Sequence, residues 1–241
     1  PSVPLPPQNL RFMNEDDAKF IRIGSDNLAL MIEQGFTAQS DLLDIGSGYG
    51  RLPSAIIRDM DYQATYVGVD ILPRHIEWCA QNIGSVYPNF NFGVMDVKND
   101  RYNPQGRYLA SEYRLPFEDA SFDYSVLFSV FTHMYELDIT NYLRQIHRIL
   151  RSSGRCMATF FMFDEARLPA VTDPANALCM AHALNDYTLY HNAADPLHAI
   201  AFHRAFVIGL IEQNGFKVIT EHLGTWAGGS RCYQDVVVFE K

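Results

Sequence analysis

The sequence has few cysteines, and they lie far apart. Its four, Cys79, Cys156, Cys179 and Cys232, form no C-x-x-C pair. This spacing excludes the usual zinc-site patterns and a dense disulfide framework, so free thiols are expected. Basic residues are also few, with 19 Lys and Arg against 28 Asp and Glu and a formal net charge of −9. Binding of nucleic-acid phosphates needs clustered Lys and Arg, and we therefore expect no nucleic-acid partner.

Long hydrophobic runs are missing as well. No stretch approaches the length of a membrane span, and the proline-rich start, PSVPLPP, lacks the basic and apolar regions of a signal peptide. We expect a cytoplasmic protein with no membrane partner. The rest of the composition is ordinary: 241 residues, 48% of them hydrophobic and 20% charged, are enough for one α/β domain with an insertion.

Short apolar runs alternate with segments of helical periodicity. The expected strands are 42–45, 66–71, 90–95, 122–130, 155–161, 216–222 and 236–239. The expected helices are 52–60, 73–83, 139–150 (stopped by Gly154) and 201–214, after one or two helices within 15–34. Between about 164 and 198 no clear strand pattern is present. This β-α alternation predicts a parallel, doubly wound sheet with a closing pair of strands.

The stretch LLDIGSGYGR places three glycines at alternate positions directly after a buried strand. Glycines there let backbone N–H groups and a helix N-terminus come close to a ligand, which lies at the carboxyl ends of parallel strands. A dinucleotide fingerprint needs G-x-G-x-x-G, but Arg51 stands where its third glycine belongs. The turn therefore favours a different ligand.

The pattern D-x-G-x-G-x-G resembles the first motif of class I S-adenosylmethionine (SAM)-dependent methyltransferases. FDYSVLFSVFTHM resembles their fourth motif, and YLRQIHRILRSSGRCMATFF their next helix and fifth strand. The resemblance is strong over residues 40–161 and weaker over the last strands. The chain as a whole resembles a subgroup of small bacterial methyltransferases that share the pieces PP..LRF, GRYLASEYRLPFEDASFD and YQDVVV. That subgroup often has W-C-G-R before the final strand, whereas this chain has WAGGSR at 226–231, so the role of this loop stays open.

The resemblance implies a Rossmann-like fold, with a seven-stranded mixed sheet, helices on both faces and an antiparallel last strand. With the pattern of elements above, we expect an N-terminal helical cap, residues 1–40, and a methyltransferase domain, residues 41–241. The cap and an insertion at about 164–200 would cover the acceptor pocket. The cofactor would be SAM, converted to S-adenosylhomocysteine.

Carried over residue by residue, the resemblance also implies the cofactor contacts. Asp70 would hold the ribose hydroxyls, Asp96 the adenine amine, and Asp44 would brace the glycine turn or neutralise the methionine ammonium. Arg51 would pair with the cofactor carboxylate or form a salt bridge on the helix surface. The complete expected set is Asp44, Gly46, Ser47, Gly48, Gly50, Arg51, Asp70, Ile71, Asp96, Val97, Phe128 and Ser129.

Histidines are the candidate bases. His133 follows the fourth strand and could accept a proton from an oxygen nucleophile, with a structural role as the alternative. His182, His191 and His203 are further candidates, and their spacing predicts no metal site. Trp226, Tyr187 and Tyr190 would wall the acceptor or pack in the core or lid.

The predicted reaction is an in-line displacement in which an O, N or C nucleophile of a small molecule, such as a sugar or natural product, takes the methyl group. No N-P-P-Y motif is present, which argues against adenine or glutamine amino groups as acceptors. Three alternatives stay open: a protein or RNA acceptor, a non-catalytic SAM-binding module, and an NAD-dependent oxidoreductase.

Overall fold

The computed structural model describes residues 3–11 and 15–241. Residues 1–2 of the proline-rich start and Phe12 of the LRF piece lie outside the described residues, as do residues 13–14. Every helix in the described part of the chain is too short or too polar to cross a membrane. All four cysteines are free thiols, and Cys79 and Cys156 are buried.

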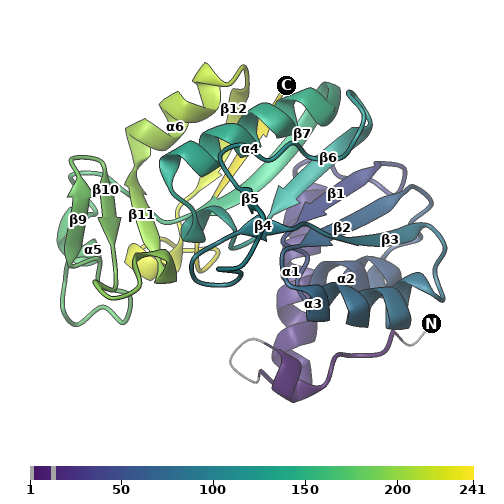
Figure 1. Ribbon diagram of the computed structural model, residues 1–241. Helices are drawn as coiled ribbons and strands as arrows, with labels where there is room; N and C mark the ends of the chain where they lie inside the picture. Colours follow the sequence, from purple (N-terminus) through teal and green to yellow (C-terminus); the bar gives the residue numbers. More distant parts are fainter. Residues whose placement is uncertain (1–2, 12–14) are drawn as a thin grey trace. The chain divides into compact units, whose positions relative to one another are not determined.

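Seven strands form one mixed sheet in the order β12-β13-β7-β6-β1-β2-β3 (Figure 1). β1 is parallel to β2 and β6, and β2 is parallel to β3. β13, the last strand, is antiparallel to both β7 and β12, which confirms the predicted fold class. The strands are β1 (Leu42–Ile45), β2 (Tyr66–Asp70), β3 (Phe90–Val94), β6 (Phe122–Leu127), β7 (Leu150–Phe160), β12 (Lys217–His222) and β13 (Asp235–Glu240).

The chain divides into two compact units, of which the first comprises residues 1–96 and 122–126. It contains β1, β2, β3 and most of β6, together with η1 (Gln8–Leu10), α1 (Asp17–Glu33), α2 (Arg51–Asp59) and α3 (Pro73–Cys79), which continues as a π-helical turn (Ala80–Gly84). α1 packs closely on α2 at Gly24, where an added Cβ would lie 2.8 Å from the carbonyl oxygen of Arg51. β1 is buried along its whole length, as expected for a strand covered on both faces.

The second unit comprises residues 97–121 and 127–241. In it, α4 (Glu136–Ile149) and α6 (Arg204–Gln213) lie over β7, β12 and β13 (Figure 1). A smaller sheet has the order β8 (Met162–Phe163), β11 (Ile200–His203), β10 (Thr188–Tyr190), β9 (His182–Asn185). Short elements complete the unit: β4 (Val97–Lys98), β5 (Tyr108–Leu109), η4 (Phe131–His133), α5 (Leu168–Val171), η5 (Pro196–His198) and η6 (Thr225–Ala227).

Two of the predicted elements differ from the structure. Gly154 does not stop a helix: α4 ends at Ile149 because Leu150 is already extended, with φ −72° and ψ 140°, and Gly154 lies inside β7. Residues 201–203 are strand β11 and not helix, because they pair with β10 and β8; α6 begins only after His203.

The segment 164–198, which showed no strand pattern, contains β9 and β10. These strands are only three or four residues long, and Thr188 is their one fully buried residue. An alternation of apolar and polar residues is therefore too short to detect in the sequence. The small sheet buries Phe161, Phe163, Val171 and Met180 in a cluster with Trp226. This region is therefore an ordered part of the second unit with its own apolar core.

Candidate functional site

The glycine turn after β1 has the backbone that its sequence requires. Gly46, Gly48 and Gly50 have φ angles of +80°, +55° and +78°, which favour glycine over residues with a Cβ. A Cβ added at Gly50 would lie 2.9 Å from the Ile83 side chain, but one added at Gly48 would meet nothing within 4 Å. The hydroxyl of Ser47 is buried without a hydrogen-bond partner among the described residues. The turn thus has an open side at Gly48, where a ligand can approach the backbone closely.

Asp70 connects this turn to the end of β2. Its carboxylate accepts hydrogen bonds from the backbone N–H of Gly48 and of Leu72, both at 2.9 Å, and Nδ1 of His75 lies 3.5 Å away. The side chain is largely buried, with 7% of the residue exposed. A carboxylate offers about four lone-pair positions, so Asp70 can accept two further hydroxyl groups in this geometry.

Asp44, in the middle of β1, is a buried carboxyl with one hydrogen-bond donor among the described residues, the Tyr66 hydroxyl at 2.6 Å. Burial raises the pKa of Asp44 to about 7; the Tyr66 hydrogen bond opposes this change, and the negative charge of Asp70 adds to it. A cation beside Asp44 would favour its ionised form. The glycine turn is therefore bordered by a carboxyl that can respond to a positively charged ligand near neutral pH.

Arg51 begins α2 and forms an ion pair with Glu15, whose side chain is buried. Its guanidinium carbon also lies 5.4 Å from the centre of the Phe20 ring. Of the two roles left open for Arg51, the structure shows a salt bridge, made to the segment before α1.

Ile71 and Asp96 follow the ends of β2 and β3. These strands pair in parallel with Asp70 opposite Val94, so both residues lie at the same edge of the sheet. Ile71 is half-buried and Asp96 is exposed. The first unit thus brings together the expected contacts Asp44, Gly46, Ser47, Gly48, Gly50, Arg51 and Asp70 at one turn, with Ile71 and Asp96 along the same strand ends.

The remaining expected contacts belong to the second unit. Val97 is buried and opens β4, and Phe128 and Ser129 follow β6. Ser129 has a φ of +57°, an uncommon backbone conformation for a residue with a side chain. Its N–H donates to the Thr159 hydroxyl at 2.7 Å, and its own hydroxyl donates to the Gln234 side chain at 2.9 Å. Backbone strain of this kind is concentrated at functional sites, which keeps Ser129 a candidate.

His133 ends η4 in a defined tautomer. Its Nδ1 lies 2.8 Å from the carbonyl oxygen of Leu197, which can only accept, so Nδ1 carries the hydrogen and Nε2 the lone pair. The Tyr102 hydroxyl lies 3.5 Å from Nε2. Burial lowers the pKa of His133, an effect that the Leu197 hydrogen bond opposes. The imidazole is thus neutral at pH 7, with its basic nitrogen facing Tyr102.

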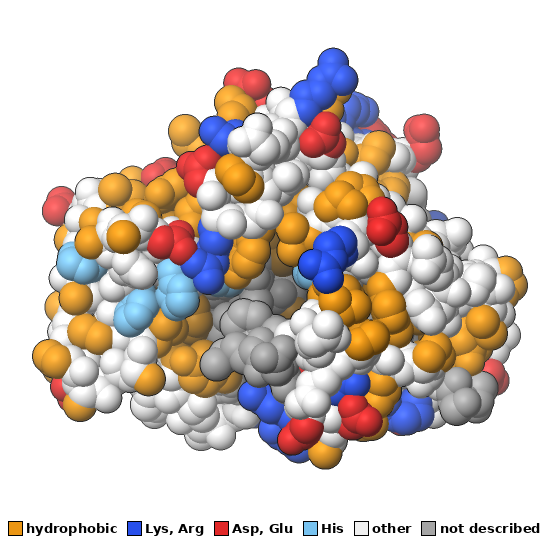
Figure 2. All heavy atoms as spheres, turned by 60° about the horizontal axis from the view of Figure 1, so that its bottom comes forward, with side chains coloured by type: hydrophobic (Ala, Val, Ile, Leu, Met, Phe, Trp, Pro, Cys, Tyr) orange, Lys and Arg blue, Asp and Glu red, His pale blue; other side chains and the backbone are white. Residues whose placement is uncertain are grey.

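The three other histidines considered as bases each contact a group of the protein. Nδ1 of His191 lies 2.8 Å from the Cys179 carbonyl oxygen, the His182 ring stacks on Tyr190, and His203 caps α6 through the N–H of Ala205. Figure 2 shows histidine side chains gathered on the side of the molecule where Figure 1 places β9 and β10. Across residues 3–11 and 15–241, no group of three or more His, Cys, Asp or Glu side chains could hold a metal ion.

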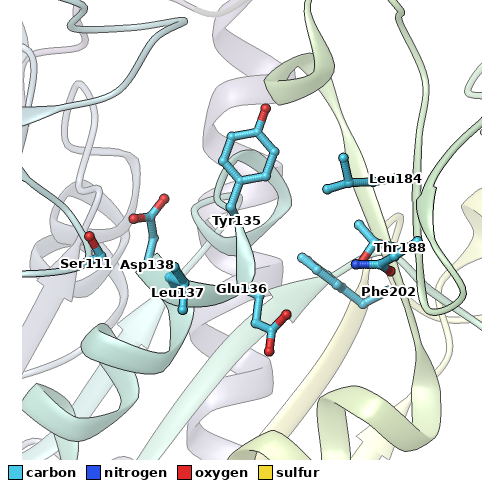
Figure 3. Close-up of a pocket in the computed structure, with 9 residues that line it drawn as sticks. Ser111, Tyr135, Glu136, Leu137, Asp138, Leu184, Thr188 and Phe202 are labelled. Carbon is cyan, nitrogen blue, oxygen red and sulfur yellow. The ribbon is translucent and has the colours of Figure 1, made fainter.

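Two cavities are formed by described residues of the second unit. One, of about 300 Å³, has Ser111 and Asp138 on one side, Leu184, Thr188 and Phe202 on the other, and Tyr135 and Glu136 between them (Figure 3). The other, of about 530 Å³, is lined by residues 100–102 and 194–196 and again by Tyr135. Tyr187 donates to Glu136 at 2.7 Å, and Trp226 is buried and donates to Asp235. Trp226 and Tyr187 therefore have partners within the protein.

Sequence reasoning missed three residues next to the predicted ones: Tyr66 beside Asp44, Glu15 beside Arg51, and Tyr102 beside His133. Both β1 and β2 were expected as strands of a parallel sheet. Their pairing could have suggested that Tyr66, on β2, lies near Asp44, on β1. No local signal marks Tyr102, which lies in the polar turn NDRYN at 99–103.

Comparison with known proteins finds a matching domain family and similar folds. Residues 43–158 match the family described as "Methyltransferase domain". Among solved structures, the PH0226 protein of Pyrococcus horikoshii OT3 has 20% identity and a TM-score of 0.62 over 96% of this chain and 94% of that chain. A SAM-dependent methyltransferase of Methanosarcina mazei has 18% identity and a TM-score of 0.58, over 88% and 96%.

A third structure carries ligands. It is the 1,6-didemethyltoxoflavin-N1-methyltransferase of Burkholderia thailandensis, with bound 1,6-didemethyltoxoflavin and S-adenosylhomocysteine. Its identity is 18% and its TM-score 0.58, over 93% of this chain and 79% of that chain. At these identities the likeness to the three structures concerns the fold.

Proposed function

We propose that this chain, whose residues 43–158 match a methyltransferase domain, is a class I SAM-dependent methyltransferase, that its methyl acceptor is a small molecule and that the glycine turn of the first unit binds the cofactor. SAM supplies a methyl group already activated on sulfur, so alignment of the acceptor can provide much of the rate enhancement, on the order of 7–11 kcal/mol. The task left to the protein is to hold both molecules and to manage the acceptor's proton.

The turn fits an adenosyl amino acid on three points. The open side of Gly48 admits the ligand to the backbone, the ionisable carboxyl of Asp44 suits an ammonium group, and Asp70 retains lone pairs for a ribose diol. Ile71, Asp96 and Val97 would meet the adenine, and Phe128 and Ser129 the methionine arm. Arg51 would act through Glu15, by bracing the start of α2.

The two cavities of the second unit support a small acceptor. Their volumes, about 300 and 530 Å³, lie in the lower part of the range found for small-molecule sites. The formal net charge of −9 gives no support to an RNA acceptor. A small molecule, 1,6-didemethyltoxoflavin, is bound in one similar structure, and this favours a small acceptor here as well.

The observation that carries the cofactor proposal is the open Gly48 beside Asp70. We expect Asp70→Ala to weaken S-adenosylhomocysteine binding by about 1.5–3 kcal/mol, the range for hydrogen bonds to charged groups, in isothermal titration calorimetry. Asp70→Asn, which keeps the volume but not the charge, should bind with intermediate affinity. The exposed Asp61→Ala, in the same unit, is the matched control and should bind as wild type does.

Unchanged affinity in a folded Asp70→Ala variant would refute the ribose assignment. Thermal stabilisation by NAD but not by SAM would refute the assignment of the turn to SAM. If a broad small-molecule panel accepts no labelled methyl group while a protein or RNA extract does, the acceptor proposal fails and the cofactor proposal stands.

A further inference from the structure

The larger of the two cavities described above is lined by a tyrosine, Tyr102, that the sequence did not suggest as a site residue. Tyr102 lines this cavity of about 530 Å³, with Arg101 and Asp195 forming an ion pair beside it. His133 is not among its lining residues, and its ring lies edge-on to the Tyr102 phenol, with the ring centres 5.3 Å apart. A molecule in the cavity would therefore contact Tyr102 and reach the imidazole only through it.

The chain fixes the two side chains relative to each other. Asn99 donates its side-chain N–H to the backbone carbonyl of His133 at 3.0 Å. The side-chain oxygen of the same Asn99 accepts the backbone N–H groups of Arg101 at 3.1 Å and Tyr102 at 3.0 Å. One asparagine thus holds the turn that carries Tyr102 against the segment that carries His133.

The orientation of His133 gives this pair a direction. Leu197 holds the hydrogen on Nδ1, so Nε2 faces the Tyr102 hydroxyl with a lone pair. The charged and titratable groups around the pair include Arg101, Asp195 and His198. Burial lowers the pKa of His133, Arg101 and His198 add to this effect, and Asp195 opposes it. The guanidinium carbon of Arg101 lies 5.2 Å from the centre of the Tyr102 ring, where it can stabilise negative charge that develops on oxygen.

We propose that this cavity binds an acceptor with a weakly acidic hydroxyl, such as a phenol, and that the Tyr102 hydroxyl takes its proton while His133 takes the proton of Tyr102. The proposal rests on the proposed function and deepens it. An amine attacks through a free lone pair and needs no base beforehand, whereas a hydroxyl must lose its proton, so a base in the wall favours an oxygen acceptor. Tyr102 is then a catalytic residue and His133 a positioning residue that acts through it.

The step balances. The acceptor oxygen forms a bond to the methyl carbon as the carbon–sulfur bond breaks and leaves its electron pair on sulfur. The hydroxyl proton passes to Oη of Tyr102, whose own proton passes to Nε2 of His133. The products are the methyl ether, S-adenosylhomocysteine and an imidazolium, which returns its proton to solvent. The 3.5 Å separation is long for a hydrogen bond, as is common in catalytic pairs without substrate.

The test uses 4-nitrophenol as the probe, because its phenolate absorbs visible light. With wild-type protein at pH 6, with and without S-adenosylhomocysteine, we expect the bound probe to be at least threefold more ionised than the free probe. Tyr102→Phe keeps the ring and should bind the probe without this increase. His133→Gln should lose the increase at every pH between 5 and 8, so that the bound probe titrates as the free probe does. Tyr108→Phe, an exposed tyrosine of the same unit that lines neither cavity, is the control and should behave as wild type.

Three results would overturn the proposal: no probe binding at millimolar concentration, binding without increased ionisation, or an increase that persists in a folded Tyr102→Phe variant. Circular dichroism and thermal unfolding establish that each variant is folded. Because S-adenosylhomocysteine binding is measured separately by calorimetry, its loss would count against the proposed function, and a normal value with a failed probe result would count against Tyr102 alone.

Discussion

Two buried aspartates, one in each unit, differ in how completely the protein satisfies them. Asp235 is 0% exposed and accepts four hydrogen bonds: from the N–H of Met162 at 2.6 Å and Gly224 at 2.7 Å, the indole of Trp226 at 2.8 Å and the guanidinium of Arg167 at 2.9 Å. Asp44 is 3% exposed and accepts one, from Tyr66. Burial raises the pKa of both carboxyls, but at Asp235 all four donors oppose the rise.

The difference separates a structural carboxylate from one suited to a ligand. Arg167 also donates to the carbonyl oxygens of Met162, Gly224 and Ala227, so the pair at Asp235 connects β8, η6 and β13 and leaves little for a ligand to add. Asp44 has lone pairs without donors in a buried place, where an unsatisfied polar group is costly. A ligand with an ammonium group would relieve that cost. The two sites therefore predict opposite consequences when each carboxylate is changed.

The largest effect should follow from Asp235→Ala. This change leaves the Arg167 charge and three N–H groups buried without their acceptor, and removal of one partner of a buried ion pair costs about 3–5 kcal/mol. We expect a loss of about 5 kcal/mol in the free energy of unfolding, measured in urea, because three other donors are affected besides Arg167. A loss below about 1 kcal/mol would show that Asp235 is not the anchor of this region.

Asp44 should give a smaller effect that depends on pH. Because its folded pKa, about 7, exceeds its ordinary value of 3.8, the folded state holds the proton more tightly than the unfolded state. The contribution of Asp44 to stability is fully present below about pH 4 and is lost as the pH rises to about 7. The whole difference amounts to about 4 kcal/mol at most.

The matched variant for this measurement is Asp44→Asn, which is neutral at every pH. We expect the stability of wild type relative to Asp44→Asn to fall as the pH rises from 4.5 to 7.5 in urea titrations without ligand. Saturating S-adenosylhomocysteine should reduce this fall, because its ammonium group favours the ionised carboxylate. Parallel pH profiles for the two proteins would contradict a raised pKa at Asp44.

The same contrast shows how far the sequence could predict the molecule. The glycine turn and Asp70 could be found because their signal is local: a buried run, alternate glycines, and a carboxylate that ends the next strand. The sheet β8-β11-β10-β9 could not be found, because its strands of two to four residues are defined by pairing partners up to 40 residues away, such as Met162 and Phe202. Periodicity needs longer segments.

The side-chain pairs of the site were missed for a related reason. Tyr66 meets Asp44 across 22 residues, and Tyr102 meets His133 across 31. Which donor reaches a buried carboxyl depends on strand order and loop conformation, and neither is encoded near the residue concerned. Motifs therefore predicted where the glycine turn and its neighbouring carboxyl groups lie, and the structure was needed to show how those carboxyl groups are satisfied.

The smallest effect should come from an ion pair of the same chemistry at the surface. Arg204 donates to both carboxylate oxygens of Glu221, at 2.8 and 2.9 Å, whereas Arg167 donates to one oxygen of Asp235, and the Arg204 side chain is 45% exposed. Water can solvate both charges after the pair is broken, so such pairs contribute about 0–1 kcal/mol. We expect Glu221→Gln to change the unfolding free energy by less than about 1 kcal/mol, and high salt to reduce that change further. A loss as large as that of Asp235→Ala would mean that hydrogen-bond geometry, and not burial, sets the importance of these carboxylates.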